Sequence, residues 1–147
     1  MFSAAVRAEQ ARRGSRETQE RRAASGRFQR ELSGDVIHFI GERNSAYLAT
    51  ASADGQPYVQ HRGGPPGFLR VLDQRTIAFA NYAGNRQYIS LGNLAENERV
   101  FLFLMDYAAA RRLKLWGSAR VVADEIVFTV LAWDWNCSQH IPKLVAP

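Results

Sequence analysis

The chain has 147 residues, 46% of them hydrophobic, and a formal net charge of +5. This length fits one domain with a buried core, and no apolar run approaches the ~18–20 residues of a membrane-spanning helix. Cys137 is the only cysteine, which excludes an internal disulfide and a cysteine-based metal cage and suits a reducing cytoplasm.

Residues 1–30 form a basic N-terminal arm, which we expect to be helical because Ala, Arg, Glu and Gln predominate. The arm holds eight Arg and three Glu, whereas residues 31–147 hold eleven basic and eleven acidic residues. The preferred interpretation is a solvent-exposed helix with ion pairs between residues four apart, Glu9 with Arg13 and Glu17 with Arg21. An arm that binds nucleic acid is the alternative, and it is disfavoured because no aromatic residues interleave the arginines.

Residues 31–147 are expected to form a single domain of short strands. A helix is predicted at 34–43, with Ser33 as its N-cap, and a second short helix at 86–94. The predicted strands are 46–51, 57–62, 68–72, 76–80, 100–105, 113–122 and 126–133. Asp54-Gly55 predicts a tight hairpin, and the apolar run 100–105 predicts a strand buried on both faces. Short strands with close turns indicate an antiparallel barrel or sandwich, mainly β with flanking helices.

The common catalytic templates are missing from the sequence. It has no GxGxxG, P-loop or HExxH motif. His38, His61 and His140 lie far apart without a ligand spacing, so no metal site is expected. Cys137 with His140 could form a thiol nucleophile, but nothing around them supports it, and an inert thiol is the preferred interpretation. No catalytic residue is assigned.

Arginine and asparagine residues gather where strands and loops end. Arg62 closes a strand just before a glycine–proline loop, and Asn85 and Arg86 stand where a loop enters the predicted helix. Free backbone N–H groups at a helix N-terminus and a guanidinium together suit a phosphate. Surface arginines that cap a loop are the alternative, and the residues alone leave both open.

A second cluster, Trp133 to Pro142, places two tryptophans among small polar residues. This composition fits a planar aromatic ligand with a hydrogen-bonding rim. A tail that its aromatic residues fix to the barrel explains the same pattern, and the residues alone slightly favour that.

With these segments taken together, the sequence resembles the FMN-binding split barrels related to pyridoxamine 5′-phosphate oxidase. It is similar in particular to their bacterial flavin-binding branch with a Trp-Asp-Trp-Asn-Cys-x-Gln-His-Ile-Pro tail. The resemblance runs from about residue 30 onward. The matching segments are 46–50, 54–57, 60–68, 81–86, 112–117 and 133–142. It implies an antiparallel split β-barrel for residues 31–147 and a homodimer with FMN at the subunit interface.

The resemblance also implies how one subunit holds the flavin. Arg62, Asn85 and Arg86 are expected on the phosphate. Asn81 and Gln87 would lie along the ribityl chain or the ring edge.

Further contacts are implied at the flavin ring. Gly63 and Gly64 would let the backbone pass close to the isoalloxazine. Arg112 stands where the oxidase has a glutamine facing the flavin, so that contact differs here. The candidates for the second subunit's contribution are Trp135, Asn136 and Gln139.

Two departures limit what the resemblance implies. The Lys and Arg pairs that hold pyridoxal phosphate in the oxidase are not evident, so vitamin B6 oxidation is not implied. The stretch between Val122 and Glu125 is also shorter than is usual in the family. The expected function is therefore an FMN-dependent oxidoreductase of unknown substrate in the cytoplasm. The alternatives are a flavin-binding sensor without turnover and a related barrel that uses heme or F420.

Overall fold

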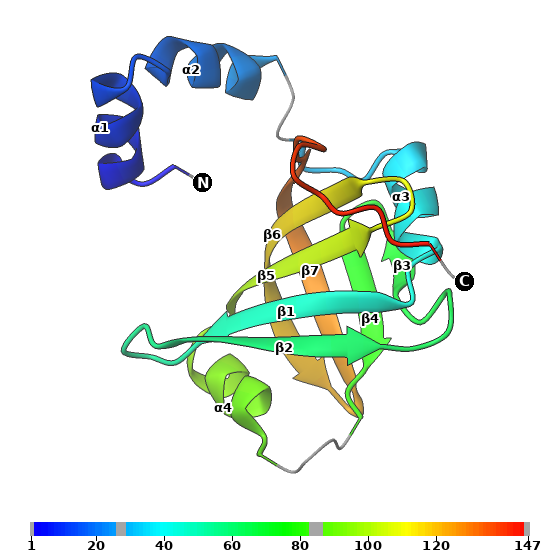
Figure 1. The fold of residues 1–147 in the computed structure, drawn as a ribbon. Coiled ribbons are helices and arrows are strands. Elements are labelled where there is room, and N and C mark those ends of the chain that lie inside the picture. Colours follow the sequence, from blue (N-terminus) through cyan, green and yellow to red (C-terminus); the bar gives the residue numbers. More distant parts are fainter. Residues whose placement is uncertain (1, 26–28, 83–86, 146–147) are drawn as a thin grey trace.

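A computed structural model describes residues 2–25, 29–82 and 87–145 of the chain. Its centre is a strongly curved antiparallel sheet of seven strands in the order β2-β1-β5-β6-β7-β4-β3 (Figure 1). The strands are β1 Ser45–Ala51, β2 Pro57–Gly63, β3 Arg70–Asp73, β4 Thr76–Ala80, β5 Arg99–Asp106, β6 Arg111–Val122 and β7 Glu125–Trp135. The expected β-barrel class and all seven predicted strands are confirmed.

Strand alternation builds the core inside the curve of the sheet. In β1, Ala46, Leu48 and Thr50 are buried and their neighbours are half-buried, as the two-residue period of a strand requires. Fully buried large side chains from β4, β5, β6 and β7 meet them, including Phe79 and Phe128. The edge strands are β2 and β3, which the chain joins through residues 64–69.

Two short helices pack against the sheet near its opposite ends (Figure 1). Helix α3, Gly34–Gly41, buries Val36, Phe39 and Ile40. The sequence indicates an apolar stripe of Val36, Ile37 and Ile40, but Phe39 takes the place of Ile37, which is half-buried. Helix α4, Ile89–Glu96, packs on β1, β2 and β6. It carries two buried polar residues, Ser90 and Asn93, so hydrogen bonds as well as apolar packing hold it.

Strand β5 differs from its expectation. The sequence predicted burial on both faces, but only Val100, Leu102 and Leu104 are buried, and Phe101 and Phe103 on the other face are half-buried. An apolar run shows that a strand avoids water, but it does not show whether its own domain covers both faces. The outer face of β5 is therefore apolar and open within this chain.

A β-bulge in β7 changes which residues face the core. Trp116 pairs with Ala132 and Gly117 pairs with Val130, so Leu131 is an extra residue and is exposed. Before the bulge, even-numbered residues of β7 face the core; after it, Trp133 pairs with a buried leucine of β6 and is itself buried. The turn from β6 to β7 is tight, since Val122 pairs directly with Glu125.

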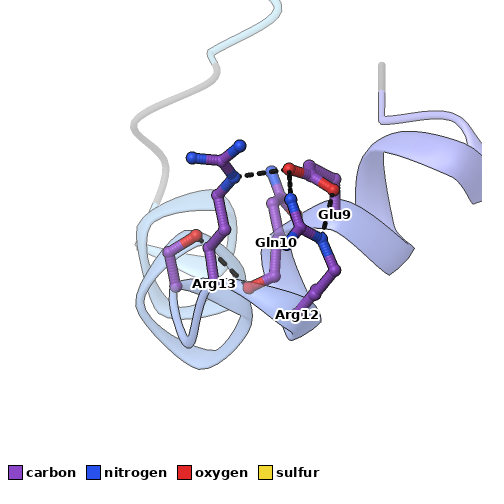
Figure 2. Close-up of polar contacts among 5 residues, drawn as sticks. Glu9, Gln10, Arg12 and Arg13 are labelled. Carbon is purple, nitrogen blue, oxygen red and sulfur yellow. Dashed lines mark hydrogen bonds and ion pairs between the residues drawn. The ribbon is translucent and has the colours of Figure 1, made fainter.

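The N-terminal arm forms helices α1, Ala4–Arg12, and α2, Arg16–Ala24, with no buried residue in either. Figure 2 shows Glu9 between the guanidinium groups of Arg12 and Arg13, so the expected Glu9–Arg13 pair is confirmed. Arg21 instead donates to the hydroxyl of Thr18. None of the described helices has the length and apolar character needed to span a bilayer.

Candidate functional site

The guanidinium of Arg62 lies at the centre of a polar cluster near the end of edge strand β2. Its Nη1 donates to Oδ1 of Asn81 at 3.2 Å and its Nη2 to Oε1 of Gln60 at 3.1 Å. Its Nε is buried and has no hydrogen-bond partner among the described residues. Burial lowers the pKa of Arg62, although an arginine stays charged at any physiological pH. The Nε–H of Arg62 is therefore a buried donor that can bind an acceptor from outside the described residues.

Helix α4 is fixed beside this cluster by hydrogen bonds to the sheet. The buried hydroxyl of Ser90 donates to Oε1 of Gln60 at 2.8 Å, and Nδ2 of Asn93 donates to Oγ1 of Thr50 at 2.9 Å. The helix begins after Tyr88, which is left-handed (φ 53°) and gives no side-chain cap. The side chain of Tyr88 thus accepts no hydrogen bond from the first turn of the helix, and Ser90 in that turn contacts the Arg62 cluster through Gln60.

A pocket of about 290 Å³ adjoins Asn81. Its walls are the 65–68 loop after β2 and the residues on either side of Asn81, namely Ala80 and Tyr82. An exposed ion pair between Arg70 and Glu125 forms part of its wall. The backbone N–H of Asn81 donates to the carbonyl of Asp124 at 2.8 Å, so the tight β6–β7 turn holds this residue in place.

The structure brings together only part of the predicted phosphate site. Arg62 and Asn81 are in contact, and Gln87 is exposed just before α4. Asn85 and Arg86 lie outside the described residues. These positions are joined by two residues that the sequence analysis missed, Gln60 and Ser90. The signal for Gln60 was its spacing, since residues two apart share a face of a strand.

Gly63 and Gly64 lie at the end of β2, and the close approach they allow is internal to the chain. A Cβ on Gly64 would stand 2.6 Å from Cβ of Phe68, and one on Gly63 would stand 3.1 Å from Cε1 of His61. Any contact of these two residues with a cofactor stays a prediction.

The remaining predicted residues gather around the C-terminal tail, which follows β7. Nε and Nη2 of Arg112 both donate to the carbonyl of Cys137, at 3.1 and 2.8 Å. Asn136 and Gln139 are exposed. The bulge turns Trp135 inward, where its ring packs edge-on against Phe39 at 4.9 Å. Asn136 and Gln139 thus present their side chains to solvent, whereas the ring of Trp135 is engaged within its own subunit.

The described residues contain no group of three or more His, Cys, Asp and Glu side chains placed to hold a metal ion. Exposed aromatic and apolar side chains flank the Arg62 cluster instead. Tyr82 is 70% exposed, Tyr88 55% and Ile89 39%. Apolar groups left in water beside a polar cluster are typical of a surface that a ligand or another chain covers.

Comparison with known proteins places these features in context. The family model of pyridoxamine 5′-phosphate oxidase matches residues 34–144. Among solved structures, a single-residue variant of HupZ from Group A Streptococcus is similar with a TM-score of 0.56 and 16% identity, covering 71% of this chain and 99% of its own. A candidate pyridoxamine 5′-phosphate oxidase of Lactobacillus delbrueckii has a TM-score of 0.55 and 17% identity, covering 71% and 94%.

A third solved structure is similar across the same fold. It is a Clostridium acetobutylicum protein of the pyridoxinephosphate oxidase family, related to general stress protein 26, with a TM-score of 0.55 and 12% identity over 75% of this chain and 89% of its own. No curated protein matches the sequence. At these identities the structures establish the split-barrel fold, and the ligand has to be argued from the site.

Proposed function

The chain belongs to the pyridoxamine 5′-phosphate oxidase family, and from this premise we propose that it is a cytoplasmic, homodimeric FMN-binding protein with flavin-dependent oxidoreductase activity. The observation that carries the proposal is the buried Nε of Arg62, which has no partner among the described residues. A buried donor without an acceptor costs free energy, and a phosphate oxygen supplies the acceptor.

The residues around Arg62 fit the phosphate end of FMN. Asn81 and Gln60 each accept one hydrogen bond from the guanidinium and fix its plane. The N-terminus of α4, which the side chain of Tyr88 does not cap, would add N–H donors and a favourable helix dipole. Asn85, Arg86 and Gln87 remain proposed contacts, the first two on the phosphate. The isoalloxazine, when bound, supplies the electron chemistry by accepting and releasing hydride or electrons.

The pocket beside Asn81 is the proposed place for the body of the flavin. It is walled by the 65–68 loop, and Tyr82 offers an aromatic face there. Gly63 and Gly64 lead the chain into that loop. The protein's own residues would bind and orient the cofactor and exclude water from it, and we assign no proton transfer to any of them.

A second copy of the chain is proposed to complete the site. The exposed side chains of Tyr82, Tyr88 and Ile89 offer it an apolar surface at the cofactor. Asn136 and Gln139 are exposed on the tail and are the side chains best able to reach a partner's flavin. Trp135 and Arg112 remain candidates. Arg112 would face the ring and stabilise negative charge on the reduced flavin, so an Arg112→Ala protein should have a lower flavin reduction potential.

The proposal is tested by comparing FMN with riboflavin, which lacks the phosphate. Wild-type protein should retain FMN through desalting, show the visible bands of oxidised flavin and bind riboflavin much more weakly. Arg62→Gln should weaken FMN binding by roughly 10- to 100-fold, because it removes charge-assisted hydrogen bonds. Its riboflavin affinity should be unchanged. The matched control is Arg120→Gln, an exposed arginine on β6.

Three results would each contradict a part of the proposal. Equal losses of FMN and riboflavin affinity in Arg62→Gln would show that Arg62 does not hold the phosphate. If the protein neither retains FMN nor quenches its fluorescence, the assignment of a flavin cofactor is wrong. A Soret band after adding heme would then favour the heme alternative. Sedimentation of the FMN-loaded protein as a monomer would contradict the homodimer.

A further inference from the structure

The two side chains that accept hydrogen bonds from the guanidinium of Arg62 are held in different ways. Asn81 is fixed through its backbone, whose N–H donates to the carbonyl of Asp124 at 2.8 Å. The amide of Gln60 stands instead at the end of a flexible side chain, on the edge strand β2. Ordering a long side chain costs entropy that one hydrogen bond barely offsets. The bond between Arg62 and Gln60 therefore needs a further contact to have one geometry.

Ser90 makes that further contact. Its hydroxyl donates to Oε1 of Gln60 at 2.8 Å, and the same oxygen accepts from Nη2 of Arg62 at 3.1 Å. The two donors occupy both lone pairs of the amide oxygen. They also determine which way round the amide lies, because Arg62 can only donate and would meet an NH2 group donor to donor. The two hydrogen bonds thus tie the guanidinium to helix α4.

The hydroxyl of Ser90 is a fixed point because its helix is attached to the sheet. Ser90 is only 2% exposed, and α4 packs on β1 and β2 (Figure 1). One turn later on the same helix face, Nδ2 of Asn93 donates to Oγ1 of Thr50 at 2.9 Å. A serine within a helix commonly bonds to its own backbone, whereas this one donates to a side chain of the sheet. Its hydroxyl therefore acts on the Arg62 cluster.

We propose that Ser90 is a positioning residue for the phosphate of FMN, which it influences through Gln60 and Arg62. The buried Nε of Arg62 can meet a phosphate oxygen only in one orientation of the guanidinium. Ser90 holds that orientation before the ligand arrives, which reduces the entropy lost on binding. The identity of the ligand rests on the proposed function, whereas the effect of Ser90 on Arg62 does not.

Asn93 provides a matched control within the same helix. Like Ser90, it is buried and donates one side-chain hydrogen bond to the sheet. Among the described residues, however, no hydrogen bond links Asn93 to Gln60 or Arg62. Loss of either hydrogen bond would loosen α4, but only loss of the Ser90 hydroxyl would release the guanidinium. A role in helix packing alone therefore predicts the same effect for Ser90→Ala and Asn93→Ala.

The first test compares FMN with riboflavin, with affinities measured by flavin fluorescence in the full-length protein. Ser90→Ala should weaken FMN binding about three- to tenfold and leave riboflavin binding unchanged, since only FMN carries the phosphate. Ser90→Thr keeps the hydroxyl and should recover most of the FMN affinity. Asn93→Ala should leave the preference for FMN over riboflavin unchanged. In an Arg62→Gln background, Ser90→Ala should cause no further loss, because it acts through Arg62.

The second test needs no ligand. Nitrogen-15 relaxation of the Nε–H group of Arg62 reports how rigidly the guanidinium is held, and its signal is the one that Arg62→Gln lacks. The group should be rigid in the wild type and in Asn93→Ala, and should lose that order in Ser90→Ala.

The two tests separate this inference from the proposed function. Equal losses of FMN affinity in Ser90→Ala and Asn93→Ala would overturn the positioning role and leave Ser90 with helix packing alone. An Arg62 Nε–H group that stays equally rigid in Ser90→Ala would also overturn it. If the wild type shows no preference for FMN while Ser90→Ala still releases Arg62, the phosphate ligand is wrong and the positioning of Arg62 by Ser90 is supported.

Discussion

Replacing Gly117 by alanine is expected to destabilise the sheet strongly. A Cβ at this position would stand 2.3 Å from the carbonyl oxygen of Thr129 and 2.5 Å from Cζ of Phe128. The first contact is with backbone of the paired strand, which cannot rotate away as a side chain could. Overpacking of a core costs about 1–3 kcal/mol, and we expect the upper end because the opposing atom is fixed. For a chain of this size that lowers Tm by roughly 6–12 °C.

The matched control makes the same chemical change where there is room. Gly92 lies inside α4, and a Cβ there meets nothing within 4 Å. Gly92→Ala should stabilise the protein by about 0.5–1 kcal/mol, because alanine loses less backbone entropy on entering a helix. Both variants are measured by urea unfolding monitored by circular dichroism. A Gly117→Ala protein as stable as wild type would refute the argument that the backbone of β7 leaves no room for a Cβ at this position.

Two other predictions concern charge and the arm. Asp106→Asn should lower Tm at neutral pH. The Ala109 N–H, and then the Arg43 guanidinium, hold the pKa of Asp106 below its ordinary value of 3.8 against the opposing effect of burial. That stabilisation is present above pH 3.8 and is lost as pH falls through the lower folded-state pKa of Asp106. The Tm values of wild type and Asp106→Asn, plotted against pH, should therefore converge in acid. A constant difference in Tm down to about pH 2 would contradict this prediction. Deleting residues 1–25 should change Tm by less than about 2 °C, since neither α1 nor α2 contains a buried residue. A larger loss would show that the arm contributes to the packing of the barrel.

The sequence predicted the elements well because each has a local signal. Asp54-Gly55 marks the β1–β2 hairpin, where Gly55 has φ +91°, and the β4 prediction matches Thr76–Ala80. Arg62 was found because a charged residue closes a strand before a glycine–proline loop. These signals lie within a few residues of the feature they predict.

The parts that could not be predicted depend on tertiary packing. Ser90 joins the site only because α4 docks beside Gln60. The inward turn of Trp135 depends on one extra residue, Leu131, whose side chain gives no sign of a bulge. The open outer face of β5 was missed for a related reason, since apolar residues look alike whether they face a core or an unfilled pocket. The local sequence pattern shows that an apolar residue avoids water, but only the folded sheet shows which residues it packs against.

The position of β4 in the sheet has a consequence for how the chain folds. β4 pairs with β3 on one side and with β7 on the other, and β7 comes last in the chain among the described strands. Until β7 emerges from the ribosome, the β3–β4 hairpin has an unpaired edge and β6 lacks its second neighbour. Pairings between distant segments are slow to form and expose edges that can aggregate. We therefore expect the rate-limiting step of folding to be the docking of β7, and the nascent chain to be most vulnerable just before it.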